Sequence, residues 1–230
     1  MRFSIYRYNP ETGQKPTMQD IELDFQPEGK MLLDAILALK ELDPTLSVRR
    51  SCREGVCGSD AMNINGQNGL ACITPLADLK QPITLRPLPG LPVIRDLIVD
   101  LTQFYQQYRS IQPYLIEKSP RPEKERLQSA EDRERFDDTT KCILCGACTT
   151  SCPSFWADPN YVGPAAIVQA HRFLFASRDE GKQERLATLN GQEGVWRCRT
   201  VFNCVEACPR GINVTRAIGE VKLALLKGKV

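Results

Sequence analysis

The sequence has no apolar stretch of the roughly 18 residues that a membrane-spanning helix needs. A long apolar segment, LPVIRDLIVDL, is interrupted by Arg95, Asp96 and Asp100. We therefore expect a chain that does not itself cross a membrane. Its first residues, MRFSIYRYNPETG, have neither the apolar core of a signal peptide nor the Arg- and Ser-rich composition of a transit segment. This predicts a protein that is made and kept in a reducing cytoplasm.

An excess of charge of one sign is also missing. The 30 Lys and Arg residues are nearly balanced by 28 Asp and Glu residues, which leaves a net charge of +2. Proteins that bind nucleic acid normally carry a basic face, so this balance argues against a nucleic-acid partner. The sequence also has no GxG pair, and so no dinucleotide fingerprint. No set of residues suggests acid–base chemistry on a small substrate.

Cysteine, in contrast, is abundant, with ten residues in the chain. A disulfide framework would suit a small secreted protein, which this sequence does not resemble. Zinc is the stronger alternative, but three cysteines at successive x₂ spacings overfill a tetrahedral zinc site. The run Cys142, Cys145, Cys148, Cys152, followed by Pro153, has the C-x₂-C-x₂-C-x₃-C-P spacing of bacterial iron–sulfur proteins. We therefore expect iron–sulfur clusters.

A second run repeats this template with one cysteine replaced. It reads Cys198, Val201, Cys204, Cys208 and Pro209. An isopropyl group has no donor atom for iron, so the position of Val201 cannot supply a ligand. In two-cluster ferredoxins the fourth cysteine of each run binds the cluster of the other run.

This rule, applied to both runs, predicts two different clusters. The first is a [4Fe–4S] cluster with four thiolate ligands, Cys142, Cys145, Cys148 and Cys208. The second has three thiolates, Cys152, Cys198 and Cys204. A cubane corner without a ligand tends to lose its iron, so the second cluster is expected to be [3Fe–4S], with a potential high enough for delivery to a quinone. The alternative is that another side chain fills the corner and the cluster is an ordinary [4Fe–4S] centre.

A third cysteine pattern lies in the first half of the chain. Cys52, Cys57, Asp60 and Cys72 follow the plant-type [2Fe–2S] pattern C-x₄-C-x₂-C…C, with Asp60 in place of the third cysteine. An ionised carboxylate is a workable iron ligand. The hypothesis is a [2Fe–2S] cluster with three thiolates and Asp60. The alternative is that Asp60 only forms hydrogen bonds in the loop and another group completes the iron.

The segments around this pattern predict a small α+β domain over residues 1–100. Alternating apolar residues predict strands at 2–8, 20–25 and 83–88, and Leu and Ile at helical spacing predict a helix at 30–42.

A connecting region is expected at 101–140. A helix at 95–109 leads into it, and EKSPRPEKERLQSAEDRERFDDTT then carries eight acidic and six basic side chains. This charged segment is interpreted as a solvated linker or a surface helix.

The remaining residues, 141–230, are expected to be helical, with helices at 164–178, 182–190 and 214–228 and the seven cysteines in loops between helices.

Three further side chains are interpreted as structural. His171, the only histidine, lies on a predicted helix. Trp196 and Phe202 are expected to be core side chains that shield the third cluster from water.

These patterns together resemble the iron–sulfur subunits of the succinate dehydrogenase and fumarate reductase family. The resemblance covers essentially the whole chain and is carried by RRSCREGVCGSDAMNINGQNGLACITP, RPLPGLPVIRDLIVD, KCILCGACTTSCPSFW and FNCVEACPRGIN. It implies an N-terminal β-grasp plant-type [2Fe–2S] ferredoxin domain and an all-α bacterial-type two-cluster ferredoxin domain. An Asp at position 60 occurs among succinate dehydrogenases, which favours succinate oxidation.

The resemblance also implies an electron relay within a larger oxidoreductase of aerobic respiration and the tricarboxylic acid cycle. A flavoprotein subunit with FAD oxidises succinate, and integral membrane anchor subunits, with or without haem b, host a quinone beside the [3Fe–4S] cluster. The expected location is the cytoplasmic face of the bacterial inner membrane. The alternatives are a quinol:fumarate reductase subunit and a free multi-cluster electron carrier.

By the same resemblance, Pro153, Ser154, Trp156 and Arg199 are assigned to the quinone pocket. The sequence departs from the family pattern at two positions nearby. Ala157 stands where a second tryptophan is expected, and Arg199 stands where a histidine follows the first cysteine of the second run. Either the quinone differs or its hydrogen bonds come from the anchor subunits.

Overall fold

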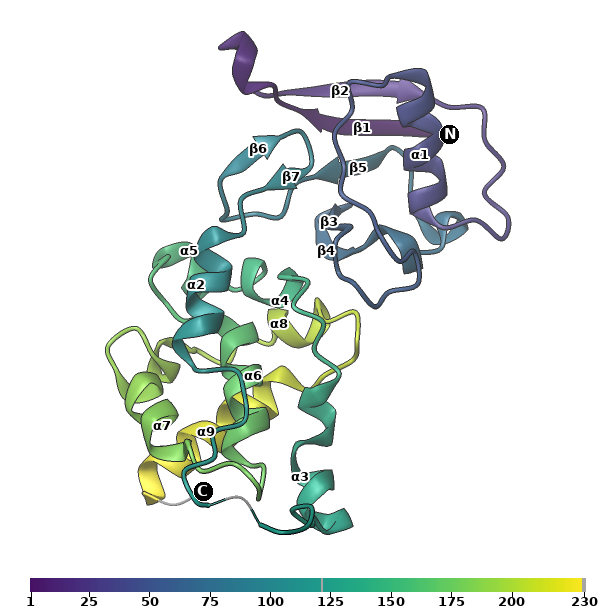
Figure 1. Ribbon diagram of the computed structural model, residues 1–230. Helices are drawn as coiled ribbons and strands as arrows, with labels where there is room; N and C mark the ends of the chain where they lie inside the picture. Colours follow the sequence, from purple (N-terminus) through teal and green to yellow (C-terminus); the bar gives the residue numbers. More distant parts are fainter. Residues whose placement is uncertain (121, 229–230) are drawn as a thin grey trace. The chain divides into compact units, whose positions relative to one another are not determined.

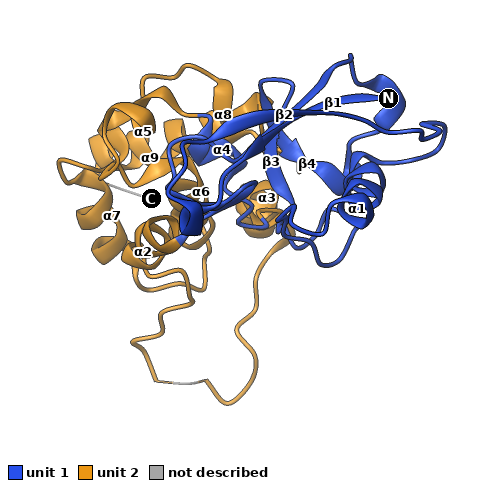
Figure 2. Cartoon of the chain, turned by 90° about the horizontal axis from the view of Figure 1, so that it is seen from above, with its two compact units in different colours: residues 1–101, 143–151 blue, residues 102–142, 152–230 orange. Residues whose placement is uncertain are grey.

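The computed structural model describes residues 1–120 and 122–228, which divide into two compact units (Figure 1). Unit 1 comprises residues 1–101 and 143–151, and unit 2 comprises residues 102–142 and 152–230, apart from those not described (Figure 2). The segment 143–151, which carries Cys145 and Cys148, therefore belongs to the same unit as the N-terminal residues, although it follows them at a distance in the sequence.

Unit 1 is built on a mixed five-stranded sheet of order β2-β1-β5-β3-β4. Its strands are β1 (Arg2–Arg7), β2 (Thr17–Glu22), β3 (Ala61–Ile64), β4 (Gln67–Leu70) and β5 (Ile83–Arg86). Strand β1 runs antiparallel to β2 and parallel to β5, while β3 is antiparallel to both β5 and β4. The expected strands at 2–8 and 83–88 are confirmed, whereas the second strand begins and ends three residues earlier than its expected bounds.

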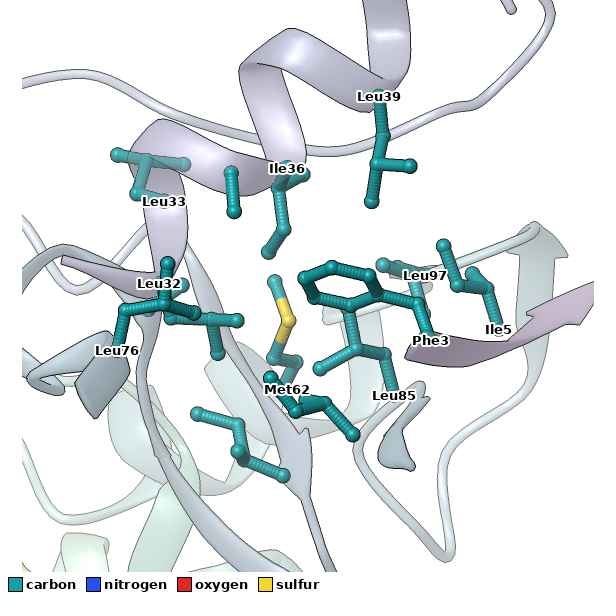
Figure 3. Close-up of a cluster of buried hydrophobic side chains, with 14 of the residues drawn as sticks. Phe3, Ile5, Leu32, Leu33, Ile36, Leu39, Met62, Leu76, Leu85 and Leu97 are labelled. Atoms are coloured by element: carbon teal, nitrogen blue, oxygen red, sulfur yellow. The ribbon is translucent and has the colours of Figure 1, made fainter. Parts of the chain in front are cut away.

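Helix α1 (Leu32–Leu42) covers one face of this sheet and confirms the expected helix at 30–42. Its buried side chains Leu33, Ile36 and Leu39 face Phe3 and Met62 on the strands (Figure 3). Because strand side chains alternate between faces, only every second residue of β1 and β5 reaches this core. The core includes Cys72, at the end of the cysteine-bearing segment 52–72.

The hairpin of β3 and β4 was not expected from the sequence, which suggested a loop between Cys57 and Cys72. Asn65 and Gly66 form its two-residue turn with positive φ angles of 49° and 89°. This Asn-Gly pair is the preferred sequence of a tight hairpin turn. The hairpin places Asp60 immediately before β3 and Cys72 just after β4.

The expected helix at 95–109 is wrong over its first seven residues. Residues 93–110 instead form β6 (Val93–Arg95), β7 (Ile98–Val99) and α2 (Thr102–Ser110), so the helix begins only at Thr102. Asp96 adopts a φ of 44° in the turn between the strands, and its buried carboxylate accepts backbone N–H groups from Tyr8 and Ser47. These long-range hydrogen bonds fix a turn where the local pattern alone favoured a helix.

Short helices complete unit 1. They are the 3₁₀ helices η1 (Pro10–Thr12), η2 (Ala71–Ile73) and η3 (Leu76–Asp78), and the single-turn helix α4 (Ala147–Thr150). Asn68 of β4 fixes α4, because its amide nitrogen donates to the carbonyl oxygen of Ala147 at 3.2 Å and to Thr150 Oγ1 at 2.9 Å.

Unit 2 is helical, and no strand occurs in the part of it that the structure describes. After α2 its helices are α3 (Ala130–Thr140), α5 (Pro153–Ala157), α6 (Gly163–Leu174), α7 (Lys182–Asn190), the 3₁₀ helix η4 (Val195–Arg197), α8 (Asn203–Glu206) and α9 (Val214–Lys227). Helix α6 is almost completely buried and packs against α2, α3, α7 and α9.

The expected helices of this unit are confirmed at α6, α7 and α9, although α6 ends four residues before its expected end. The charged segment contains a surface helix, α3, in its second half. The expectation that all seven late cysteines lie in loops is wrong for Cys148 and Cys204, which lie within the single-turn helices α4 and α8. Among the described residues, no helix is long and apolar enough to cross a bilayer.

Candidate iron–sulfur cluster sites

All ten cysteines lie in the described part of the chain, and no disulfide joins any of them. Among the described residues, no three His, Cys, Asp or Glu side chains are arranged around a single metal ion. The cysteines lie in the three sequence groups identified above, and each group has its own local backbone geometry.

The first group begins with a loop whose backbone N–H groups surround a sulfur atom. Cys52 Sγ accepts from the backbone nitrogens of Glu54, Val56 and Cys57 at 3.5, 3.4 and 3.2 Å. The backbone nitrogen of Cys52 in turn donates to Cys57 Sγ at 3.4 Å. Such N–H donors stabilise negative charge on sulfur, and so tune a bound cluster.

The surroundings of Cys57 favour its thiolate form. Burial by itself raises the pKa of Cys57, but hydrogen bonds from Ser59, including its Oγ at 3.1 Å, and from Cys52 lower that pKa to about 7. The thiolate is the metal-binding form of cysteine. The loop therefore prepares Cys57 as a ligand.

Asp60 and Cys72 lie together in the interior of unit 1. The Asp60 side chain is only 2% exposed, and the backbone nitrogen of Cys72 donates to its Oδ2 at 2.5 Å. Burial, together with the hydrogen bond between the thiol and the Asp60 side chain, raises the pKa of Cys72 to about 12. An oxygen donor and a sulfur donor thus lie side by side in the interior of unit 1. This donor set fits an iron ligand shell.

Gly58 lies directly against Cys145, and both belong to unit 1. A Cβ atom added at Gly58 would lie 2.8 Å from Cys145 Cβ and 2.9 Å from its Cα, which is too close for real atoms. The φ angle of Gly58 is +70°, a region that favours glycine. The loop between Cys57 and Asp60 therefore touches the beginning of the second cysteine group.

The four cysteines expected to hold the [4Fe–4S] cluster come from both units. Cys145 and Cys148 belong to unit 1, whereas Cys142 and Cys208 belong to unit 2. In unit 1, Leu144 has a φ of 55°, and the chain then turns into α4, which carries Cys148. This turn is compatible with the expectation that Cys145 and Cys148 bind one cluster.

The third group surrounds a pocket that lies entirely within unit 2. The pocket holds about 320 Å³ of empty space, including its open mouth, and its walls include Cys152, Cys198, Cys204 and Val201. Burial, together with the nearby Cys152 and Cys198 thiols, raises the pKa of Cys204 to about 11. The structure therefore brings three thiols together and places the valine in the same wall.

The backbone around Val201 is held in an unusual shape. Thr200 and Phe202 have φ angles of 57° and 69°, and the backbone nitrogen of Thr200 donates to Cys198 Sγ at 3.4 Å. Val201 and Phe202 are each 52% exposed.

The expectation that Phe202 and Trp196 are core side chains is therefore wrong. Phe202 is more than half exposed, and Trp196 is 38% exposed, with its Nε1 donating to Asn190 Oδ1 at 2.8 Å. The apolar character of these two side chains does not by itself distinguish a place in the core from a place on the surface.

The residues expected at a quinone pocket lie in or next to this same pocket. Pro153, Ser154 and Arg199 line it, and Trp156, on the same short helix α5 as Ser154, is 51% exposed. Ser154 Oγ donates to the carbonyl oxygen of Arg197 at 2.9 Å, which ties α5 to the second cysteine run.

The sequence analysis missed six residues of the pocket wall: Tyr161, Pro164, Thr200, Asn203, Thr215 and Ile218. Thr215 and Ile218 are three residues apart on α9 and so share one helix face. This spacing indicates that the two side chains point to the same side of α9, but it fits ordinary core packing as well as a cluster pocket.

His171 belongs to a different environment in unit 2. Its side chain is buried, with Nε2 2.7 Å from Glu220 Oε2 and Nδ1 3.3 Å from Thr139 Oγ1. The surrounding pocket contains no cysteine. Burial lowers the pKa of His171, which Glu220 opposes and the neighbouring Arg135 and Arg216 reinforce.

Comparison with known proteins identifies two iron–sulfur domains in the chain. Residues 2–106 match the model of a 2Fe-2S iron-sulfur cluster binding domain, and residues 135–209 match that of a 4Fe-4S dicluster domain. The chain is 51% identical over 229 residues to the succinate dehydrogenase iron-sulfur subunit of Coxiella burnetii, covering 99% of this chain and 97% of that protein. This chain belongs to the family of succinate dehydrogenase iron–sulfur subunits.

Further succinate dehydrogenases agree. The iron-sulfur subunit of Paracoccus denitrificans is 48% identical over 96% of this chain and 86% of that protein. A chain of the Mycobacterium smegmatis Sdh1 complex in the apo form superposes with a TM-score of 0.89 at 26% identity, covering 99% of this chain and 96% of that chain.

The expected α+β fold, with a [2Fe–2S] ferredoxin domain before a helical dicluster domain, is thus confirmed. The succinate dehydrogenase iron–sulfur subunit transfers electrons within an oxidoreductase complex, and the alternative functions are not favoured.

Proposed function

We propose that this chain carries electrons from the FAD of a flavoprotein subunit, through [2Fe–2S], [4Fe–4S] and [3Fe–4S] clusters, to a membrane quinone. The observation that carries this proposal is the pocket of unit 2, in which three thiols converge and Val201 occupies the wall where a fourth ligand would stand. The clusters, when bound, supply the one-electron carriers of the relay. The residues of the chain hold them and set their surroundings.

The proposed ligands follow the three cysteine groups. The [2Fe–2S] cluster is held by Cys52, Cys57, Asp60 and Cys72, the [4Fe–4S] cluster by Cys142, Cys145, Cys148 and Cys208, and the [3Fe–4S] cluster by Cys152, Cys198 and Cys204. Support comes from the N–H groups that surround Cys52 Sγ and from the buried carboxylate beside Cys72. These groups orient the proposed ligands and favour negative charge on their sulfur atoms.

The pocket of the third cluster is also the proposed quinone-facing end. Exposed apolar side chains lie at and beside it, namely Val201 and Phe202 in its wall and Trp156 on α5. An exposed apolar patch of this kind fits an integral membrane anchor subunit, with or without haem b. Ser154 and Arg199 line the pocket and offer a hydroxyl and a guanidinium group near the bound quinone.

The partners follow from the absence of a dinucleotide fingerprint in the sequence. The proposed assembly has a flavoprotein subunit that oxidises succinate and a membrane anchor that places this chain on the cytoplasmic face of the bacterial inner membrane. The direction proposed is succinate oxidation in aerobic respiration.

The test is purification of the complex from detergent-extracted membranes. We expect a flavoprotein and an anchor subunit to co-purify, and succinate to reduce a soluble quinone analogue. Iron and acid-labile sulfide should equal the sum of one [2Fe–2S], one [4Fe–4S] and one [3Fe–4S] cluster, and the air-oxidised complex should show the sharp [3Fe–4S] EPR signal. A chain that purifies alone, or that lacks this signal, would contradict the proposal.

A further inference from the structure

The pocket of the third cluster contains a buried hydroxyl group that has no hydrogen-bond partner in the described structure. Thr215 is 9% exposed, and its Oγ1 is buried without any acceptor or donor in reach. It is the second residue of α9, which begins at Val214. The side chain also lines the pocket together with Cys152, Cys198 and Cys204.

The position of Thr215 explains why its hydroxyl is unpaired within the chain. A threonine in a helix usually donates to a carbonyl oxygen three or four residues earlier. For Thr215 those residues are Gly211 and Ile212, which precede the helix and do not present helical carbonyl groups. Leaving a buried hydroxyl unpaired is costly, so such a group normally has a partner that completes it.

We propose that Thr215 Oγ1 donates a hydrogen bond to a sulfur atom of the third cluster and thereby raises the potential of that cluster. This inference rests on the proposed cluster site. Sulfur bears more negative charge after the cluster takes up an electron, so the hydrogen bond is stronger in the reduced state. The start of α9 adds to this effect, because a helix N-terminus favours negative charge.

Burial distinguishes the cluster from the quinone as the partner of this hydroxyl. Val201 and Phe202, which line the same pocket, are each 52% exposed and mark its open side. Thr215 is nearly enclosed and shares its helix face with Ile218, so it belongs to the closed side. Helix α9 also packs against α8, which carries Cys204.

The experiment compares Thr215→Val and Thr215→Ser in the whole complex. Valine keeps the shape of threonine without the hydroxyl, and serine restores the hydroxyl. EPR-monitored redox titration of the [3Fe–4S] signal should show that Thr215→Val shifts the reduction equilibrium of this cluster toward the oxidised state by about tenfold, which is ~59 mV for a one-electron couple. Thr215→Ser should recover most of that shift.

A second measurement separates a hydrogen bond from a structural effect. After exchange into D₂O, pulsed EPR of the oxidised cluster should detect a deuteron coupling that Thr215→Val loses and Thr215→Ser keeps. Thr139→Val is the matched control, since Thr139 is also buried but its Oγ1 already donates to the carbonyl oxygen of Phe136 at 2.8 Å. The control should change neither the potential nor the coupling.

Failure of this inference is distinguishable from failure of the proposed function. A wild-type complex without the [3Fe–4S] signal contradicts the cluster assignment itself. A normal signal whose potential and deuteron coupling are the same in Thr215→Val overturns only the role of Thr215. A change in the quinone KM without any change in potential also overturns it, because it would place the hydroxyl on the quinone.

Discussion

Arg185 and Asp179 form an ion pair whose side chains are both completely buried, with Arg185 Nη1 2.5 Å from Asp179 Oδ1. The pair is also bonded to the chain that follows α2. Arg185 donates to the carbonyl oxygens of Gln112 and Tyr114, and Asp179 accepts the backbone N–H of Ile116. The two charges therefore fix an irregular segment that crosses unit 2 without secondary structure of its own.

Removal of one partner should destabilise the protein strongly. Asp179→Ala leaves the Arg185 guanidinium buried without its counter-charge, which costs about 3–5 kcal/mol. For a chain of this size that corresponds to a fall in Tm of roughly 10 °C. Thermal unfolding of the cluster-loaded protein measures this fall in Tm.

Glu184→Ala, which removes the exposed partner of Lys118, is the control and should lower the Tm much less. Equal effects would contradict a special role for the buried pair.

Asp60→Cys should retain a [2Fe–2S] cluster but change its EPR spectrum. A thiolate at position 60 donates more electron density to iron than a carboxylate does, so the g values and the potential should both move. EPR of the reduced protein and redox titration provide the measurements.

Asp60→Asn is the companion variant, because its amide oxygen preserves the hydrogen bond from the Cys72 backbone nitrogen but binds iron poorly. If Asp60 is a ligand, this variant should lose the cluster or hold it weakly. A normal spectrum in both variants would show that Asp60 only orders the loop.

Val201→Cys should convert the third cluster. The new thiolate would stand in the wall that already holds Cys198 and Cys204, so a fourth iron gains a ligand. We expect the [3Fe–4S] EPR signal of the oxidised protein to disappear, one more iron per chain to be bound, and quinone reduction to slow. Val201→Ala adds no donor atom and should leave the signal in place. Persistence of the signal in Val201→Cys would refute the alignment of the second run.

The pKa of His171 should lie below 6.5. Burial disfavours the imidazolium, and the effect of Glu220 opposes burial only in part. Because the unfolded chain takes up this proton more readily, stability should decrease as the pH falls below about 6.5. His171 is the only histidine, so its labelled imidazole gives one resonance that reports the pKa directly by NMR.

Two variants test the cause of this shift. Glu220→Gln removes the carboxylate 2.7 Å from Nε2 and should lower the pKa of His171 further. Arg135→Gln removes a neighbouring positive charge and should raise it. A pKa above 6.5 in the wild type, or shifts in the same direction in both variants, would contradict this interpretation.

The sequence predicts most of the regular structure because the apolar spacing is strong there. The leucines and isoleucines of α1 and the pattern of α7 are sufficient to place those helices. The turn at Asp96 was not predictable, since it depends on hydrogen bonds to Tyr8 and Ser47, far away in sequence. Local spacing contains no information about such partners.

The candidate sites were predictable to the extent that spacing in sequence determines them. The cysteine runs predict the cluster types, and Val201 predicts an incomplete corner in the third cluster. Thr215 was not found, because a threonine in an amphipathic helix looks the same whether it faces protein or a cluster. Trp196 and Phe202 were misplaced, because apolar side chains cover a partner's surface as readily as they fill a core.

The close packing of Gly58 on Cys145 has a consequence for the speed of the relay. At this point the peptide that follows Cys57 touches the peptide that carries a ligand of the next proposed centre, with no side chain between them. A methyl group at position 58 would push these two peptides apart and so lengthen the gap between the first two proposed carriers. A residue that binds no iron and carries no charge would thus affect how far an electron has to tunnel between them.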